Sequence, residues 1–312
     1  MNSKIKPIVV VGSINIDFVM NTPRIPLAGE TIQGDGFEQH FGGKGANQAV
    51  AVARLGYPVD MIGRVGSDLP GEQMRASLRD AGVGIEAVEP APGPSGIASI
   101  TVSQSGQNAI VITSGANAHL TPEYLDQHQE RIRNAGMVLA QLEVPLCTVE
   151  HLAELCRHYQ VPLILDPAPA QSLPKPLLSH IAWFTPNETE ATFYAESIDP
   201  ALRNARQHRL AEAFLNLEVR GVVLKLGERG ALIASSTIME ELPPIAVKAV
   251  DSTAAGDTFN GAFAVGLMSG MSSSEAGRFA SAAAAISVTR RGAQPSMPSR
   301  SEVDQLLQES RD

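Results

Sequence analysis

Short apolar runs rich in β-branched residues alternate along the chain with longer stretches in which apolar residues recur every three or four positions. The short runs are typical of strands buried on both faces, and the longer spacing is typical of helices with one apolar side. We expect strands over residues 8–12, 59–63, 137–142, 161–165, 181–185 and 222–226. We expect helices over residues 46–55, 71–81, 145–159, 189–194, 205–219, 257–268 and 274–289. This alternation predicts an α/β fold, a three-layer sandwich whose central sheet is mostly parallel and covered by helices on both faces.

Two stretches interrupt the alternation. Residues 17–41 are strand-like but rich in proline and glycine, and residues 96–115 contain two short strand patterns, 98–102 and 109–113, around a polar turn. Together the two inserted segments predict a small β-sheet lid. One face of such a lid is free to cover a ligand or to pair with another subunit in a homodimer. The alternative is an extension of the edge of the main sheet.

Length, charge and cysteine content narrow the class of protein. At 312 residues and 44% hydrophobic content, the chain suits a single α/β domain over residues 1–312 that carries the lid. A formal net charge of -9 argues against a nucleic-acid or anionic membrane surface, which needs clustered Lys and Arg. We find neither a signal peptide nor an apolar run as long as a membrane span, and Cys147 and Cys156 have no metal or redox spacing. We therefore expect a cytoplasmic protein with two buried free thiols.

The strongest candidate for catalysis is the run Asp-Ser-Thr-Ala-Ala-Gly-Asp-Thr-Phe-Asn-Gly at residues 251–261. It places one carboxylate, Asp257, beside small residues at the predicted start of a helix. The first N–H groups of a helix lack internal partners and can bind an anion, which Ala255 and Gly256 would allow to come close. This layout suits phosphoryl transfer with Asp257 beside the anion. The alternative is an ordinary helix start that the Asp caps.

A second glycine-rich run, Gly-Gly-Lys-Gly-Ala-Asn at residues 42–47, precedes a predicted helix. Its glycines let backbone N–H groups approach a polar ligand, to which Lys44 and Asn47 offer charge and hydrogen bonds. The run is not a P-loop, because it lacks the earlier glycine of that motif and the hydroxyl residue after the lysine. The chain also lacks the three-glycine fingerprint of dinucleotide-binding proteins, which argues against an NAD-dependent oxidoreductase.

Polar residues also follow two predicted strands. Asn15 and Asp17 are two positions apart and leave the same face of a strand. Glu143 follows the strand predicted over 137–142, at the end of the strand where open α/β sheets bind ligands. An amide and carboxylates suit the hydroxyl groups of a sugar. They are also common wherever strands end, so ordinary turn chemistry is the alternative.

Two further segments could surround an anionic ligand. Asn187 and Glu190 lie in the run Thr-Pro-Asn-Glu-Thr-Glu, on one side of the first turn of a predicted helix. Their oxygens could hold the water shell of a Mg²⁺ ion, or the two residues could form a capping box. Residues 225–230, Lys-Leu-Gly-Glu-Arg-Gly, follow another strand and predict either a bed for a nucleotide or a hairpin turn.

The order and the intervals of these segments resemble those of the ribokinase, or PfkB-type, carbohydrate kinase family essentially from end to end. The Gly-Gly-Lys-Gly-Ala-Asn and Ala-Ala-Gly-Asp runs resemble the paired signatures of that family and are highly specific together. The resemblance implies an ATP-dependent sugar kinase that phosphorylates the primary 5-hydroxyl of D-ribose to ribose 5-phosphate, with Mg²⁺ and K⁺ as cofactors. It also covers Gln141-Leu-Glu, Asp166-Pro-Ala-Pro and Thr289-Arg-Arg-Gly-Ala-Gln-Pro-Ser.

The resemblance implies a role for each matching residue, with Asp257 as the catalytic base beside Ala255 and Gly256. The implied sugar-binding residues are Asn15, Asp17, Gly43, Lys44, Asn47, Glu143 and Asp257. The implied nucleotide contacts are Asn187, Lys225, Leu226, Gly227, Gly230, Gly256 and Ser281. The implied neighbours of Mg²⁺, through bound water, are Asn187 and Glu190. The implied ligands of K⁺, several of them through carbonyl oxygens, are Asp251, Thr253, Ser287, Arg290, Gly292 and Ser296.

Two residues depart from the best-known pattern of the family. Lys225 replaces a threonine near the phosphates, and Ser281 stands where a histidine often flanks the adenine. Both lie on the nucleotide side, so they bear on nucleotide affinity more than on the choice of sugar.

Other acceptors and another class of protein stay open. The acceptor could be 2-deoxyribose, another small sugar or a nucleoside, although few aromatic residues besides Phe37 and Phe41 are present in the first lid segment to hold a base. A non-catalytic sugar sensor with the same fold is the alternative to an enzyme. The intact Asp257 argues against a sensor, which would have no use for a base there.

Overall fold

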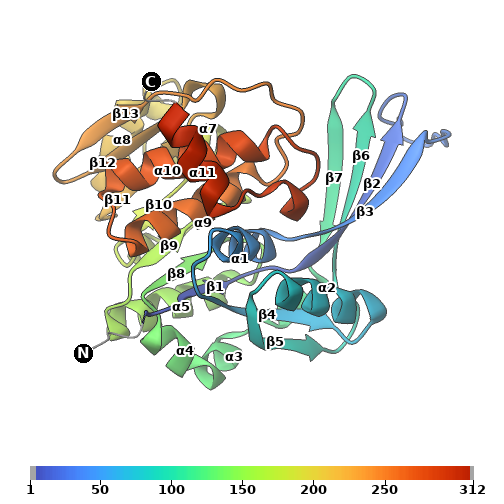
Figure 1. Cartoon of the computed structure of the whole chain (residues 1–312), viewed down its shortest axis with the longest axis horizontal. Helices are drawn as coiled ribbons and strands as arrows, with labels where there is room; N and C mark the ends of the chain where they lie inside the picture. Colours follow the sequence, from blue (N-terminus) through green and yellow to red (C-terminus); the bar gives the residue numbers. More distant parts are fainter. Residues whose placement is uncertain (1–4, 310–312) are drawn as a thin grey trace.

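A computed structural model describes residues 5–309 and shows a central sheet between two layers of helices (Figure 1). The strands of the central sheet are β1 (Ile8–Val11), β4 (Val59–Gly66), β5 (Gly84–Ala91), β8 (Met137–Ala140), β9 (Leu163–Leu165), β10 (Trp183–Phe184), β11 (Gly221–Lys225), β12 (Ala231–Ser235) and β13 (Met239–Leu242). Their order across the sheet is β13-β12-β11-β10-β9-β8-β1-β4-β5. Neighbours from β11 through to β5 pair in parallel, whereas β12 is antiparallel to β11 and to β13. The α/β fold with a mostly parallel central sheet is therefore confirmed.

Apolar residues on both faces of the sheet account for the two helical layers. Ile8 and Val10 belong to one buried cluster and Val9 and Val11 to another, because successive side chains of a strand point to opposite faces. The first cluster includes residues of α1 (Lys44–Arg54), α2 (Leu69–Asp80), α9 (Ala255–Met268), α10 (Ser273–Ser287) and α11 (Arg300–Glu309). The second includes residues of α3 (Pro122–Gln127), α4 (Gln129–Asn134), α5 (Leu146–Tyr159), α6 (Lys175–Leu178), α7 (Glu188–Ile198) and α8 (Gln207–Leu215).

The elements that the sequence pattern missed are short, exposed or at an edge. β12 and β13 end the central sheet, and β13 mixes exposed and buried residues instead of forming an apolar run. α3, α4 and α6 have at most 6 residues, too few for a helical repeat to show. β5 and α11 bury few of their residues. Tertiary contacts, rather than a local pattern, decide these elements.

One of the two cysteines departs from the prediction. Cys156 is buried as expected, but Cys147 is exposed. α5 buries residues 149, 152, 153 and 156, which lie at helical spacing, and Cys147 in its first turn lies off that stripe. In residues 5–309 we find no helix with the length and apolar character needed to cross a membrane.

The lid is a second, separate sheet. Its strands are β2 (Asn15–Thr22), β3 (Gly36–Gly42), β6 (Gly96–Ser103) and β7 (Asn108–Thr113), in the order β3-β2-β6-β7. Figure 1 shows this sheet standing beyond one end of the sandwich. Among the described strands, those of the lid pair only with one another, so the alternative of an extended sheet edge is wrong. Every residue of β7 is exposed, which leaves an uncovered strand at the edge of the lid.

Polar residues gather where the parallel strands end. Glu143 follows β8, Asp166 follows β9, Asn187 follows β10 and Lys225 ends β11. The carboxyl ends of parallel strands share one edge of the sheet, which is where open α/β sheets bind ligands. The first turn of α9, with Asp257, reaches the same edge, since Gln48 of α1 hydrogen-bonds to both Asp166 and Asp257.

We predict that Gly45→Ala destabilises the protein by about 1–3 kcal/mol. Gly45 lies in the first turn of α1, and a Cβ there would come within 2.6 Å of the Gly12 carbonyl carbon and 2.7 Å of the Ser13 nitrogen. These are backbone atoms that cannot rotate aside, so α1 must move away from β1. Urea unfolding measures the change. Gly36→Ala is the matched control, since its Cβ meets nothing closer than 3.5 Å, and an equal loss in both variants would contradict the prediction.

Candidate active site

Asp257 lies in the first turn of α9 without capping it. The capping position belongs to Ala254, whose left-handed φ of 57° turns the chain into the helix and which makes no side-chain cap. The backbone N–H groups of Gly256 and Asp257 donate no hydrogen bond within residues 5–309, as is usual in a first helical turn. The alternative of a helix start capped by Asp257 is therefore wrong. The free N–H groups, next to the small side chain of Ala255, form a site that can accept an anion; we call it the anion hole.

Two amides from α1 hold the carboxylate of Asp257. Asn47 Nδ2 donates to Asp257 Oδ2 at 3.0 Å, and Gln48 Nε2 donates to Asp257 Oδ1 at 3.3 Å. Burial raises the pKa of Asp257 to about 6; the charge of Asp166 adds to the rise and that of Lys44 opposes it. A carboxylate with this pKa can take a proton near neutral pH from a hydroxyl group within hydrogen-bond reach.

Besides Asp166 and Lys44, two further carboxylates interact electrostatically with Asp257: Asp17 and Glu143. Glu143 Oε2 accepts hydrogen bonds from Ser13 Oγ at 2.5 Å and from the Lys44 backbone N–H at 3.1 Å. Burial alone would lower the pKa of Lys44, but the charge of Asp257 and of other nearby carboxylates outweighs burial and raises it. Burial and the charge of Glu143 raise the pKa of Asp17 to about 6. These acceptors around one ammonium suit a ligand with several hydroxyl groups.

Asn15 is oriented by Asn117, a residue to which the sequence assigned no role. Asn117 Nδ2 donates to Asn15 Oδ1 at 2.7 Å, and Asn117 Oδ1 accepts from the Ile14 N–H at 2.9 Å. Asn15 Nδ2 donates no hydrogen bond within the described part of the chain, so a ligand can accept one from it. Gly43 adjoins this point with a φ of 88°, and a Cβ there would lie 2.7 Å from the Asn15 nitrogen. Only the fold brings residue 117 to residue 15.

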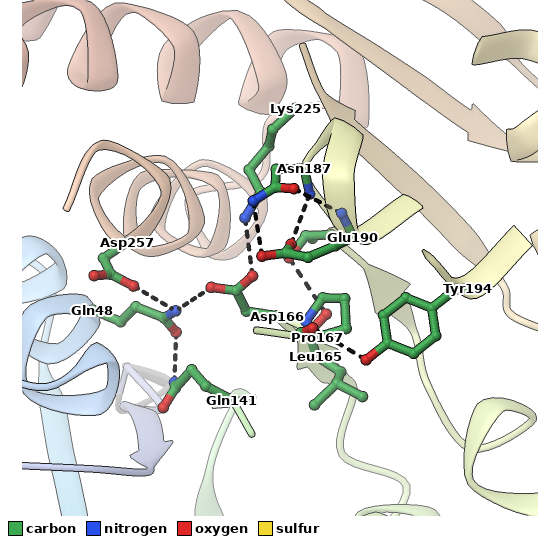
Figure 2. A network of polar contacts seen from close by, with 11 residues as sticks. Gln48, Gln141, Leu165, Asp166, Pro167, Asn187, Glu190, Tyr194, Lys225 and Asp257 are labelled. Carbon is green, nitrogen blue, oxygen red and sulfur yellow. Dashed lines mark hydrogen bonds and ion pairs between the residues drawn. The ribbon is translucent and has the colours of Figure 1, made fainter. Parts of the chain in front are cut away.

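A buried network of polar side chains links Asp257 to Lys225 (Figure 2). Gln48 Nε2 donates to Asp166 Oδ2 at 3.0 Å as well as to Asp257, and Gln48 Oε1 accepts from Gln141 Nε2 at 2.7 Å. Lys225 Nζ forms an ion pair with Asp166 Oδ1 at 3.0 Å. Sequence reasoning gave no role to Gln48, and Gln141 and Asp166 entered only as part of the resemblance. No spacing rule shows that these residues meet.

Asn187 and Glu190 form the capping box of α7, so that interpretation is confirmed. Asn187 Oδ1 accepts from the Glu190 N–H at 2.9 Å, while Glu190 Oε2 accepts from the Asn187 N–H at 2.8 Å. Glu190 Oε1 accepts from Asn187 Nδ2 at 2.8 Å, so both carboxylate oxygens are engaged. Within residues 5–309 we find no cluster of three His, Cys, Asp or Glu side chains that could hold a metal ion. This donor set fits a Mg²⁺ that is contacted through bound water.

Residues 225–230, which the sequence predicted to bind a nucleotide or to form a hairpin, make a tight turn between two strands. β11 ends at Lys225, and the chain returns as β12 after a 3₁₀ turn, Gly227–Arg229. The Leu226 N–H donates to the Gly230 carbonyl at 2.9 Å, so the hairpin-turn interpretation is also confirmed. Lys225 pairs with Asn187 through a parallel backbone bridge, which brings the two predicted nucleotide segments together. Ser281 lies half-buried on α10, and no described hydrogen bond of its side chain connects it to them.

Asp251 joins the two loops that the resemblance assigns to K⁺. Asp251 Oδ1 accepts from the Thr253 N–H at 2.9 Å and from Thr253 Oγ1 at 2.6 Å, and Asp251 Oδ2 accepts from the Gly292 N–H at 2.8 Å. Burial alone would raise the pKa of Asp251, but these hydrogen bonds outweigh burial and lower it. Three of the six assigned residues are thus in contact. The side chains of the other three bond elsewhere: Ser287, Arg290 and Ser296.

Taken together, the geometry suits transfer of an anionic group to a hydroxyl. The buried carboxylate of Asp257 can take the proton, and the anion hole at Gly256 can stabilise negative charge. On the lid side of Asp257, Glu143 offers acceptors and Lys44 an ammonium to a polyhydroxyl ligand. On the opposite side, the turn after β11 lies beside Asn187. A proton acceptor between two such binding regions is the arrangement that a kinase for small alcohols needs.

The chain is similar to carbohydrate kinases over almost its whole length. The sequence pattern of the family described as pfkB family carbohydrate kinase matches residues 6–300. A ribokinase of Haemophilus influenzae is 40% identical over 97% of this chain and 99% of its own length. The structure of a ribokinase of Thermotoga maritima matches with a TM-score of 0.91 and 38% identity, over 97% of this chain and 99% of that chain. A ribokinase of Arabidopsis thaliana complexed with ribose and ATP matches with a TM-score of 0.90 and 37% identity, also over 97% and 99%.

Proposed function

The chain belongs to the pfkB family of carbohydrate kinases, and we propose that it transfers the γ-phosphoryl group of ATP to the primary 5-hydroxyl of D-ribose. The observation that carries the proposal is the buried Asp257 carboxylate, held by two amides beside the anion hole. Similarity to ribokinases over nearly the whole chain supports ribose as the acceptor. The products are ribose 5-phosphate and ADP.

Asp257 acts as the general base of the transfer. Its pKa of about 6 leaves the carboxylate ionised at neutral pH. The hydroxyl proton passes to Asp257 while the hydroxyl oxygen forms a bond to the γ-phosphorus, and the bond from that phosphorus to the β–γ bridging oxygen breaks. Asn47 and Gln48 each hold one carboxylate oxygen, so the base keeps its orientation. The N–H groups of Gly256 and Asp257 stabilise the negative charge that spreads over the transferred group.

The sugar binds between the lid and the start of α1. Asn15 and Asp17 of β2 accompany Glu143 and Lys44 there, with the Asn117 contact leaving Asn15 Nδ2 free for a hydroxyl. Gly43 packs against the backbone of residues 13–15, where no side chain fits, and so brings the start of α1 close to Asn15. The lid covers the sugar during the reaction and keeps out water that would otherwise accept the phosphoryl group.

The nucleotide binds along the carboxyl edge between the Asn187 cap, the turn after β11 and Gly256. Bound ATP supplies the phosphoryl group, and Mg²⁺ neutralises the charge of its phosphates. Asn187 and Glu190 would hold that Mg²⁺ through its water shell, because both carboxylate oxygens of Glu190 already accept hydrogen bonds. The loops joined by Asp251 would hold K⁺, which would help to order the approach to the anion hole.

The uncovered strand β7 supports a homodimer formed through the lid. Ile110, Val111 and Ile112 are 52%, 68% and 47% exposed in the single chain. An exposed apolar edge strand pairs readily with another chain unless it is covered. A cytoplasmic location belongs to the same proposal, because the reaction consumes ATP.

The direct test of function is ADP release from MgATP with four acceptors, D-ribose, 2-deoxyribose, fructose and adenosine, each in K⁺ and in Na⁺ buffer. We predict turnover with ribose that is faster in K⁺ than in Na⁺. Turnover with another acceptor alone would overturn ribose as the substrate and leave the Asp257 chemistry in place. No turnover with any of the four would favour the sugar-sensor alternative.

A second prediction concerns the base. Asp257→Asn keeps the size of the side chain but cannot take the proton, so we expect kcat to fall about 10³-fold. Sugar affinity measured by calorimetry should change much less than kcat, because the new side chain keeps one oxygen that can accept from Asn47 or Gln48. Asp80→Asn is the control, since its side chain is 71% exposed on α2. Near-normal turnover by the Asp257 variant would exclude the proposed role.

A third prediction follows from the raised pKa of Asp257. The group is protonated below pH about 6 and then cannot act as a base, so kcat/KM for the sugar should fall about tenfold per pH unit below that value. The rate should reach a plateau at higher pH, where the carboxylate is ionised. Asp17 has a pKa of about 6 as well, so the profile is repeated with Asp17→Asn, where the fall should persist. A flat profile down to pH about 5 would contradict the assignment.

A further inference from the structure

Lys225 places an ammonium group at the anion hole of α9. The position that a Cβ on Gly256 would take lies 3.5 Å from Lys225 Nζ. Apart from Ala255, Asp257 and the nearby backbone of α9, no other described atom comes within 4 Å of that position. The positive charge therefore lies beside the first turn of α9, in which the N–H groups of Gly256 and Asp257 are free.

Asp166 holds the ammonium in this place. Lys225 Nζ lies 3.0 Å from Asp166 Oδ1, and the two side chains are only 13% and 3% exposed. Breaking such a pair would leave a buried carboxylate without its counter-charge, so the lysine does not leave it freely. An ammonium has three N–H donors, and Asp166 is the only described acceptor of Lys225 Nζ. At least one donor thus stays available to an anion in the space beside Gly256.

The same network fixes the ammonium relative to the base. Gln48 Nε2 donates one hydrogen bond to Asp166 Oδ2 and one to Asp257 Oδ1, which uses both hydrogens of its amide (Figure 2). Gln141 Nε2 engages Gln48 Oε1 and so sets which way the amide points. Lys225 and Asp257 therefore lie on a continuous chain of buried contacts.

From this geometry we propose that Lys225 is a catalytic residue that stabilises the transferring phosphoryl group, and that Asp166 is the positioning residue that holds its ammonium at the anion hole. The inference rests on the proposed function for the nature of the anion. In phosphoryl transfer, negative charge spreads over the three equatorial oxygens of the moving group. A fixed cation directed at those oxygens stabilises the transition state more than the bound nucleotide.

The experiment compares Lys225→Met, which keeps the length of the side chain and removes its charge, with the wild-type protein. We expect kcat to fall about 10²-fold, as for the loss of other preorganised charge-stabilising donors. A second readout does not need turnover: calorimetric binding of MgADP with and without aluminium fluoride, an analogue of the transferring group. Lys225→Met should weaken MgADP–aluminium fluoride binding by a similar factor and leave MgADP binding nearly unchanged. Lys175→Met, at an exposed lysine of α6, is the control.

A second variant covers the case in which Lys225→Met does not fold because Asp166 is left unpaired. Asp166→Asn/Lys225→Met removes both charges and should fold, yet show the same loss of kcat and of aluminium fluoride binding. Asp166→Asn alone should lower kcat by a smaller factor, and it should cost nothing further when added to Lys225→Met. This lack of additivity is expected of a residue that acts through Lys225 and not of one with a separate structural role. Lys225→Arg, which keeps the charge, should recover part of the rate.

Three results would overturn the inference. One is a folded Lys225→Met or double variant with wild-type kcat, and another is a variant with wild-type kcat and a raised KM for ATP. The third is equal weakening of MgADP with and without aluminium fluoride, which would make Lys225 a ligand of the nucleotide alone. If the wild type phosphorylates none of the acceptors, the proposed function fails, whereas the aluminium fluoride comparison still decides the role of Lys225.

Discussion

A single buried carboxylate at the start of a helix constrains the rest of the active site. Asp257 is 6% exposed, and both of its oxygens accept hydrogen bonds from the amides of Asn47 and Gln48. Those amides belong to α1, which lies so close to β1 that only a glycine fits at position 45. Packing of α1 on the sheet thus sets the orientation of the base. Burial also gives the base its pKa of about 6, which suits proton transfer at neutral pH.

The charged groups around Asp257 come from several separate elements, and carboxylates outnumber ammonium groups among them. Asp17, Glu143 and Asp166 bring negative charge, while Lys44 and Lys225 bring positive charge. The ammonium of Lys225 is tied to Asp166, so this pair adds no net charge to the site. An incoming anion therefore meets a cation already oriented by the protein, and no group must reorganise strongly at the moment of reaction. The same arrangement separates the acceptor-rich sugar region from the anion hole.

The inner strands and the longer helices could be predicted because each leaves a local pattern. β1, β8 and β9 are apolar on both faces, which follows from the helices on either side of the sheet. The lid was predictable because its strands interrupt the alternation, but its separation from the main sheet needed the structure. The edge strand β13 was not predicted because it mixes exposed and buried residues, whereas β12 is a buried apolar run that the sequence reasoning did not assign. Short helices such as α3 were not predicted, because six residues are too few for the helical repeat of apolar positions to show.

The sequence by itself determined the fold class, the position of Asp257 at a helix start and, through its resemblance, the family of kinases. Each of these can be recognised from residues that are close together in the sequence, because their spacing follows from helix and strand geometry. Tertiary structure alone decided which distant residues meet. Asn117 reaches Asn15, Gln48 bridges Asp166 and Asp257, and Lys225 comes to Gly256 only when separate strand ends share one edge of the sheet. These contacts join residues far apart in the chain and depend on atomic distances, so no local pattern can contain them.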